Sequence, residues 1–175
     1  MLNDPRNPPI ARIRRHRHLG TVEGADHVVI LMRTHLQKLM SEVLATNELT
    51  LDDDGDIRYQ SRQAYGYASV MRSRKEVSVE FALLVASDIK PTRKLLEEIN
   101  SINCSSPWIQ VILTNGQVIV RRRLDWLEVN EESVRRTVFQ TNAVADDIAE
   151  LIAVVHGGIT PRQQIEAATG DKGEN

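Results

Sequence analysis

The 175-residue sequence contains a single cysteine, Cys104. One cysteine excludes a disulfide within the chain, and it forms neither a CxxC motif nor a Cys/His cluster that would hold a structural metal. Domains stabilised by disulfides are typical of oxidising compartments, so this composition fits a reducing cytoplasm. We therefore expect a cytoplasmic protein that has no bound metal and needs no cofactor.

Long apolar runs and a strong net charge are also missing. A membrane helix needs about 20 consecutive apolar residues, which no stretch of this sequence provides. The first residues are polar and proline-rich, unlike a secretion signal. The formal net charge is -2, so we expect no general attraction to membranes or nucleic acids. With 41% hydrophobic residues, the chain still has enough apolar side chains for one domain with a core.

The sequence motifs of common enzyme classes are absent as well. The sequence has no GxGxxG, P-loop or HExxH motif, and Cys104 has no obvious base near it in the sequence. The acidic segment 52–56 does not match a calcium loop, because a loop starting at Asp52 has Gly55 in fourth place and Gln63 in twelfth. Asp54 and Gly55 predict a tight turn instead. We expect a protein without catalytic residues.

What the sequence does contain is a clear strand-then-helix pattern in residues 77–103. Large apolar residues occupy every second position from Val77 to Val85, which is the period of a strand with one strongly apolar face. Pro91 suits the first turn of a helix. Four apolar residues then recur at helical spacing: Leu95, Leu96, Ile99 and Ile102. We predict that the strand is central to the fold and that the helix folds back onto it.

Similar patterns predict the other elements. Helices are expected from Asp26 to about Ala45, and from the Asn130 cap to about Val155. An Asn115–Gly116 pair between two apolar runs predicts a hairpin. Strands are expected at residues 57–60, 64–72, 76–87, 107–114 and 117–124. The order α-β-β-β-α-β-β-α, with short connections, predicts an α+β fold in which a five-stranded antiparallel sheet packs against helices.

The two ends of the chain differ in composition from the middle. Residues 1–24 contain three prolines and five arginines, and we predict a flexible basic arm. Residues 25–157 are expected to form a single domain, and residues 158–175 a flexible C-terminal tail. An alternative function, a regulator that contacts nucleic acid, would use four residues of the arm: Arg12, Arg14, Arg15 and Arg17. The arm lacks the interleaved aromatic residues that stack on bases, which favours a solvated tail.

Three segments together resemble a known family: LDDDGDIRYQ, VSVEFALLVASDIKPTRKLLEEINSIN and WIQVILTNGQVIVRRRL. They are similar to YbjN-like proteins, which are grouped with the type III secretion chaperone-like fold, and to actinobacterial peptide-binding chaperone-like proteins within that group. The resemblance covers about residues 26–156. It implies an α-β-β-β-α-β-β-α fold that is often dimeric and binds an extended polypeptide, and it brings no catalytic motif. The basic arm 1–24 departs from the family's core.

Together these observations predict a non-enzymatic, chaperone- or adaptor-like module with a protein or peptide partner, and a homodimer. An extended polypeptide would lie on the sheet face away from the helices or along a sheet edge. Aromatic side chains would supply rigid apolar contact, and arginines would hold carboxylates of the ligand. The candidate peptide-binding residues are Tyr65, Tyr67, Leu84, Trp108, Ile112, Arg121 and Arg123. The alternative is that these residues pack a dimer interface or the domain's own core, because a one-residue shift in register would reverse the faces.

Overall fold

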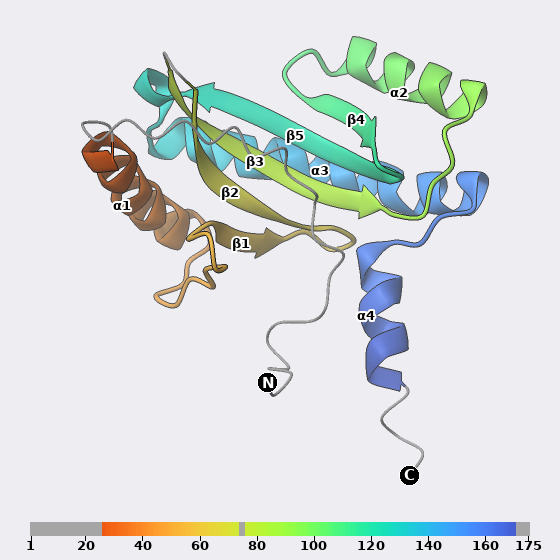
Figure 1. Cartoon of the computed structure of the whole chain (residues 1–175), viewed down its shortest axis with the longest axis horizontal. Helices are drawn as coiled ribbons and strands as arrows, with labels where there is room; N and C mark the ends of the chain where they lie inside the picture. Colours follow the sequence, from red (N-terminus) through yellow and green to blue (C-terminus); the bar gives the residue numbers. More distant parts are fainter. Residues whose placement is uncertain (1–25, 74–75, 171–175) are drawn as a thin grey trace.

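The computed structural model describes residues 26–73 and 76–170 (Figure 1). The arm 1–24, which we predicted to be flexible and basic, lies outside these residues, as does the end of the predicted tail. The described elements are α1 (Asp26–Val43), β1 (Ile57–Gln60), β2 (Tyr65–Arg72), β3 (Val77–Ala86), α2 (Arg93–Ser105), β4 (Gln110–Thr114), β5 (Gln117–Asp125), the short 3-10 helix η2 (Trp126–Glu128), α3 (Glu131–His156) and α4 (Pro161–Gly170).

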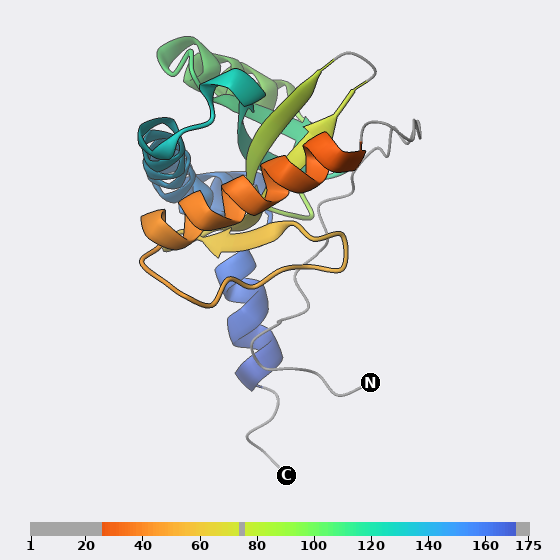
Figure 2. The same ribbon diagram turned by 90° about the vertical axis from the view of Figure 1, so that its left-hand side faces the viewer.

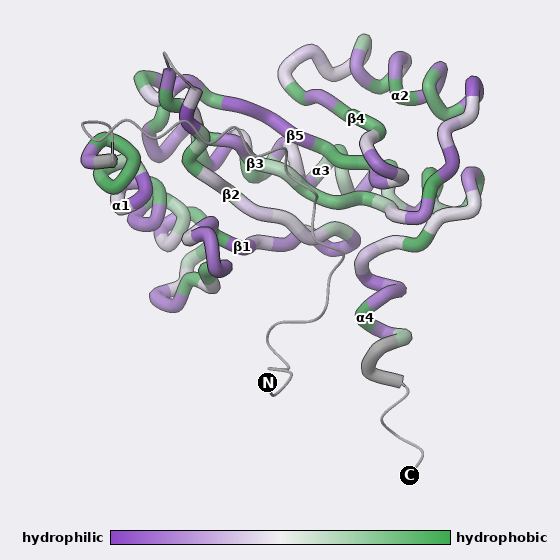
Figure 3. The backbone as a smooth tube through the Cα atoms, viewed as in Figure 1, coloured by the Kyte–Doolittle hydropathy of each residue, from purple (hydrophilic) through white to green (hydrophobic). Residues whose placement is uncertain are grey.

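The five strands form one antiparallel sheet in the order β1-β2-β3-β5-β4. The predicted α+β class, the antiparallel sheet and the order of the elements are therefore confirmed. β3 is the central strand, and most of its residues are hydrophobic (Figure 3). The Asn115–Gly116 turn joins β4 to β5 with positive φ at both residues, which is the geometry of a two-residue hairpin.

One face of the sheet and the helices enclose the main hydrophobic core. Alternate residues of β3 point into it, including Val79, Phe81 and Leu83, each with no exposed surface. α1, α2 and α3 contribute the other side of this core, and α3 runs along the sheet behind β3 and β5 (Figures 1 and 2). Burying one such aliphatic or aromatic side chain contributes about 1.5–3 kcal/mol, so this face dominates the stability of the domain.

α3 has well-defined ends that place it against β3. The Asn130 side chain accepts a hydrogen bond from the Ser133 backbone N–H, and the Ser133 hydroxyl oxygen accepts one from the Asn130 N–H. This reciprocal arrangement satisfies two backbone donors at the start of the helix. Gly157 ends the helix in the left-handed conformation, with φ of 70°. Both the Asn130 cap and the glycine stop agree with the sequence prediction.

The starts of β4 and of the second helix differ from the prediction. β4 was expected to begin at Pro107 but begins at Gln110, because the Ile109 N–H donates to the Ser106 carbonyl at 3.0 Å and closes a turn. Pro107 occupies the second position of that turn, which its fixed φ favours. The second helix begins at Arg93, after Thr92, whose hydroxyl oxygen accepts from the Leu95 N–H at 3.2 Å.

Within residues 158–175, predicted to be a flexible tail, the structure contains α4. Thr160 and Gln163 form a reciprocal cap, and Pro161 stands at the first position of the helix. A backbone bridge between Ser87 and Ile159 joins the segment before α4 to the end of β3. The Thr-Pro-x-Gln pattern of residues 160–163 was a helix-start signal that the sequence analysis did not use.

The β1–β2 loop is held to α3 by one carboxylate. Asp146 Oδ1 accepts hydrogen bonds from the Ser61 hydroxyl at 2.7 Å and from the Gln63 N–H at 2.8 Å, and Oδ2 accepts from the Arg62 N–H at 3.3 Å. The next residue of the helix, Asp147, is exposed. Hydrogen bonds to an ionised acceptor are stronger than neutral ones, so Asp146 fixes the edge of the sheet where β1 begins to pair with β2.

We predict that Asp146→Ala lowers the free energy of unfolding by about 1–3 kcal/mol, because it leaves the loop donors without their acceptor. Chemical denaturation followed by circular dichroism measures this loss. The control is Asp147→Ala, which removes the same charge from the same turn of α3 and is expected to change stability by less than about 0.5 kcal/mol. Equal effects of the two variants would contradict the role assigned to Asp146.

Candidate functional site

The second face of the sheet carries its own, smaller apolar cluster. Tyr67, Ala82, Leu84 and Ile119 form it, and Ile112 packs against it. All five side chains belong to strands, and no helix in the described part of the chain contributes to the cluster. The strand period of two puts these residues opposite the main core. We call this surface the open face because no described helix contributes to it, although Ala82, Leu84 and Ile119 at its centre are themselves at most 3% exposed.

The register aligns an apolar row across four strands of the open face. Tyr65 of β2 pairs with Leu84 of β3, Leu84 pairs with Ile119 of β5, and Ile119 pairs with Ile112 of β4. Leu84 and Ile119, in the middle, are buried, whereas Tyr65 and Ile112 at the two ends are partly exposed. Because neighbouring strands lie about 4.8 Å apart, the row forms a continuous band that runs across the strands.

A charged group lies beside this band. The Glu80 side chain, only 10% exposed, accepts a hydrogen bond from Arg123 Nη2 at 2.9 Å, and Arg121 Nη1 is 3.9 Å from the same carboxylate oxygen. Arg121 Nε also donates to Gln110 Oε1 at 3.1 Å. The register explains the group, since Arg123 is the cross-strand partner of Glu80. The two arginines therefore already hold a carboxylate of the protein itself, and together with Glu80 they leave one net positive charge on the face.

Two buried polar atoms on this face have no hydrogen-bond partner among the described residues: Ser69 Oγ and Gln117 Oε1. Ser69 shares the face of Tyr67 on β2, and Gln117 shares the face of Ile119 on β5, as the alternation of each strand requires. A buried polar atom without a partner costs about 1–3 kcal/mol. Ser69 pairs with Glu80, and Gln117 pairs with Thr114, so the two atoms lie on opposite sides of the apolar row. Polar groups of a ligand that lies on the row would recover this energy there.

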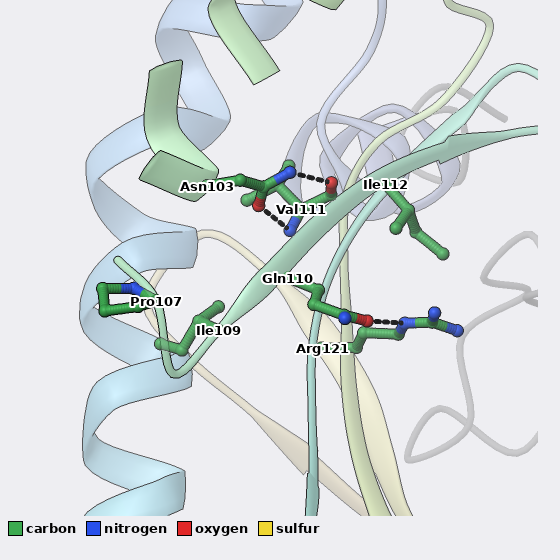
Figure 4. A pocket seen from close by; sticks show the side chains of 7 residues that line it. All are labelled: Asn103, Pro107, Ile109, Gln110, Val111, Ile112 and Arg121. Atoms are coloured by element: carbon green, nitrogen blue, oxygen red, sulfur yellow. Dashed lines mark hydrogen bonds between the residues drawn. The ribbon is translucent and has the colours of Figure 1, made fainter. Parts of the chain in front are cut away.

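A cleft of about 420 Å³ adjoins the open face at the β4 edge (Figure 4). It is lined by Asn103, Pro107, Ile109, Gln110, Val111, Ile112 and Arg121. Ile112 and Arg121 also belong to the open face, so the cleft continues that face over the edge of the sheet. In the lining of the cleft, the Asn103 side chain bonds both backbone groups of Val111 (Figure 4).

Six of the seven predicted peptide-binding residues lie on strands with their side chains toward the open face. These are Tyr65, Tyr67, Leu84, Ile112, Arg121 and Arg123. Trp108 is not with them on a strand, because it lies in the turn before β4, where its side chain is 72% exposed. Ile119 and Glu80 were not among the predicted residues. Strand alternation is consistent with their positions on this face, but only the register between β3 and β5 brings them beside Leu84 and Arg123.

The third arginine of the run, Arg122, points to the opposite face. Its Nη1 donates to Gln140 of α3, and burial beneath this helix lowers the pKa of its guanidinium from the ordinary value, with nearby Arg136 acting in the same direction. The alternation of a strand divides the three consecutive arginines in this way, with Arg121 and Arg123 on the other face. Arg122 therefore takes no part in the open face.

Other candidate sites have a simpler structural explanation. The Asp54–Gly55 turn forms as predicted, with Asp52 Oδ1 accepting from the Asp54 and Asp56 N–H groups and Gly55 at φ of 77°. Cys104 is exposed on α2. No cluster of histidine, cysteine and acidic side chains in the described ranges has the geometry of a metal site. Among the same residues, no helix combines the length and hydrophobicity needed to cross a membrane. The residues predicted to contact nucleic acid in the alternative function lie outside the residues that the structure describes: Arg12, Arg14, Arg15 and Arg17.

Comparisons with solved structures support the fold. The chain is similar to a chain of the HopA1–SchA chaperone–effector complex, with a TM-score of 0.54, 12% identity, and coverage of 69% of this chain and 97% of that one. It is also similar to a chain of the ExsC–ExsE complex, with a TM-score of 0.56, 13% identity, and coverage of 71% and 95%. A third similar chain comes from the Yersinia pestis type III secretion chaperone SycH in complex with a stable fragment of YscM2, with a TM-score of 0.51, 12% identity, and coverage of 66% and 98%.

No curated protein sequence matches the chain significantly. A family model does match residues 31–164, which include every strand of the sheet, all of α2 and α3, and most of α1. This family is TY-Chap1, described as T3SS (YopN, CesT) and YbjN peptide-binding chaperone 1. The match covers most of the chain and confirms the resemblance drawn from its strand, helix and hairpin segments. The chain therefore belongs to the TY-Chap1 family of T3SS and YbjN peptide-binding chaperones.

Proposed function

We propose that the open face binds an extended segment of another polypeptide, and that the protein acts as a chaperone or adaptor. The observation that carries this proposal is the apolar row from Tyr65 to Ile112, to which no described helix contributes a side chain. Tyr65 and Ile112 are its accessible ends. Extended polypeptides are recognised by sheets through alternate side chains, and an apolar band offers such contacts without demanding one sequence.

The comparisons support a polypeptide ligand. The family is named for peptide binding, and the similar solved structures are complexes of a chaperone with an effector or with a protein fragment. In our proposal, Tyr65 and Tyr67 supply rigid apolar contact on β2, and Leu84 and Ile112 continue the band. Arg121 and Arg123 carry the net positive charge beside the band, so they favour a segment with an acidic side chain next to its apolar residues.

We further propose that the protein works without catalysis in the cytoplasm. Family membership supports a binding role, and the sequence provides no catalytic motif. Cys104 is exposed and is the one cysteine of the sequence, which suits a reducing compartment. Trp108, exposed in the turn before β4, remains a candidate contact for a ligand that extends from the open face into the adjoining cleft.

We also propose that the protein forms a homodimer through α3. α3 exposes three large apolar side chains on its outer side, Phe139 at 74%, Leu151 at 61% and Val154 at 72%. Their spacing places them within one third of the helix circumference, on the side away from the core. A second copy of the chain that packs against this stripe would bury all three in a symmetric interface, as expected for a two-fold dimer.

We predict that the double variant Tyr65→Ala/Ile112→Ala binds its peptide ligand about tenfold more weakly or worse, because it removes both accessible ends of the apolar row. An array of short synthetic peptides selects a probe peptide with the full-length protein, and fluorescence anisotropy then measures its dissociation constant. The matched control is Leu31→Ala, which truncates an equally large side chain that is 70% exposed on α1. Failure of every peptide in the array to bind, or equal losses in the two variants, would overturn the proposed function.

We also predict that light scattering gives twice the chain mass for the full-length protein at micromolar concentration, and that Phe139→Glu/Val154→Glu gives the mass of one chain. Charges in the centre of a buried apolar interface are strongly unfavourable, so this variant dissociates the dimer. Both positions are exposed in the single chain, and the circular dichroism spectrum is therefore expected to stay unchanged. A single-chain mass for the unmodified protein would contradict the homodimer, and a dimeric double variant would exclude this stripe as its interface.

A further inference from the structure

At the β4 edge of the sheet, a side chain of the protein itself bonds backbone groups that point away from the sheet. The proposed function does not use this feature. β4 pairs on one side only, with β5, because it is the last strand of the sheet. The Asn115–Gly116 hairpin makes Thr114 and Gln117 its closing pair. In an antiparallel ladder, hydrogen-bonded and non-hydrogen-bonded pairs alternate, so Ile112 bonds to β5 while Val111 and Leu113 direct their backbone groups away from it.

The Asn103 side chain occupies the position that an added strand would take at Val111. Its Oδ1 accepts from the Val111 N–H at 2.7 Å, and its Nδ2 donates to the Val111 carbonyl at 3.0 Å (Figure 4). A primary amide offers one donor and one acceptor, which is what the backbone of a neighbouring strand would offer to this residue. Asn103 therefore acts toward β4 as a single residue of a sixth strand.

The residues at the end of α2 also bond the next outward-facing backbone group, the N–H of Ile109. The Ile109 N–H donates to the Ser106 carbonyl at 3.0 Å, so the end of α2 satisfies outward-facing groups at both Ile109 and Val111. On the other edge of the sheet, the Arg58 N–H of β1 donates to the Thr50 carbonyl at 2.8 Å. The chain itself thus engages β4 at Val111 and β1 at Arg58. An open edge is a template for pairing with another chain, and each contact interrupts that template at one position.

We infer that Asn103 determines where an extended polypeptide binds: its amide closes the β4 edge to strand addition and so directs the ligand to the open face. The inference rests on the proposed function for its ligand, but the closure itself is a property of the chain alone. Replacing Asn103 by a residue without an amide leaves the N–H and C=O of Val111 without their partner at the edge. An extended peptide then pairs with β4 through its backbone.

The closure is tested without any ligand, by hydrogen exchange of the Val111 amide in the full-length protein. Asn103→Ala is expected to speed exchange at Val111 about tenfold or more, because the bond that protects this amide is lost. Exchange at the β3 amides is expected to stay slow, which shows that the fold is retained. Asn103→Leu, which keeps the side-chain volume, serves if the alanine variant does not fold. The control Asn100→Ala changes an exposed asparagine on the same helix and leaves Val111 protected.

The site of binding is tested with the array-selected probe peptide and a version that is N-methylated at alternate peptide bonds. N-methylation removes backbone donors that strand addition needs and leaves the side chains in place. We expect both peptides to bind the unmodified protein with dissociation constants within about threefold. Asn103→Ala is expected to bind the unmethylated peptide about tenfold more tightly than the methylated one.

The outcomes separate this inference from the proposed function. Unchanged exchange at Val111 in both Asn103 variants overturns the closure, whatever the peptides do. A strong preference of the unmodified protein for the unmethylated peptide also overturns it, because the edge is then already in use. Faster exchange at Val111 without binding of either peptide supports the closure and contradicts the proposed peptide binding instead.

Discussion

The packing of α3 against the central strand is the interaction on which the rest of the structure depends. β3 has a paired neighbour on both sides and α3 across one face, so Val79, Phe81, Leu83 and Val85, which point to that face, have no exposed surface. Phe81 sits in the middle of this contact and meets the ring of Tyr59 edge to face, with 6.4 Å between ring centroids. The Tyr59 hydroxyl lies 3.5 Å from Thr141 Oγ1 on α3, and its burial raises the pKa of the phenol above the ordinary value. The contact thus fixes the position of β1 as well.

This one-sided packing creates the difference between the two faces of the sheet. Every strand alternates between them, and in the described part of the chain the helices pack on one face while strand side chains alone form the cluster on the other. On that second face, Leu84 and Ile119 form the middle of an apolar row, and Glu80 holds the arginines beside it. Glu80 neutralises one of the two arginine charges. Apolar contact is therefore the main source of affinity in the function we propose, and the remaining charge is a source of selectivity.

Polar side chains of the helices bond backbone groups at both edges of the sheet. Asp146 holds the β1–β2 loop from α3, and Asn103 holds Val111 from α2, each by bonds to backbone groups that no strand satisfies. Such bonds contribute modestly to stability when made, and leaving the buried group unpaired costs more. Their larger effect is on recognition, since a sheet with engaged edges offers its face rather than its backbone. Gly66 shows how closely the strands are set, because a Cβ there would lie 1.7 Å from the Ala82 carbonyl oxygen.

The sequence by itself determined the elements, their order and which residues of a strand share a face. These depend on a few neighbouring residues: the alternation of Val77 to Val85, the Asn115–Gly116 turn and the Asn130 cap each act locally, and all appear in the structure. Local signals also explain where the structure differs from the prediction, since Pro107 marks a turn and Thr160 begins a helix. The tertiary structure alone decided that Glu80 meets Arg123, that Ile119 completes the row of Leu84 and that Asn103 closes the edge at Val111. Each of these pairs depends on register between segments that are distant in the sequence, and a shift of one residue would change every partner without altering any local pattern.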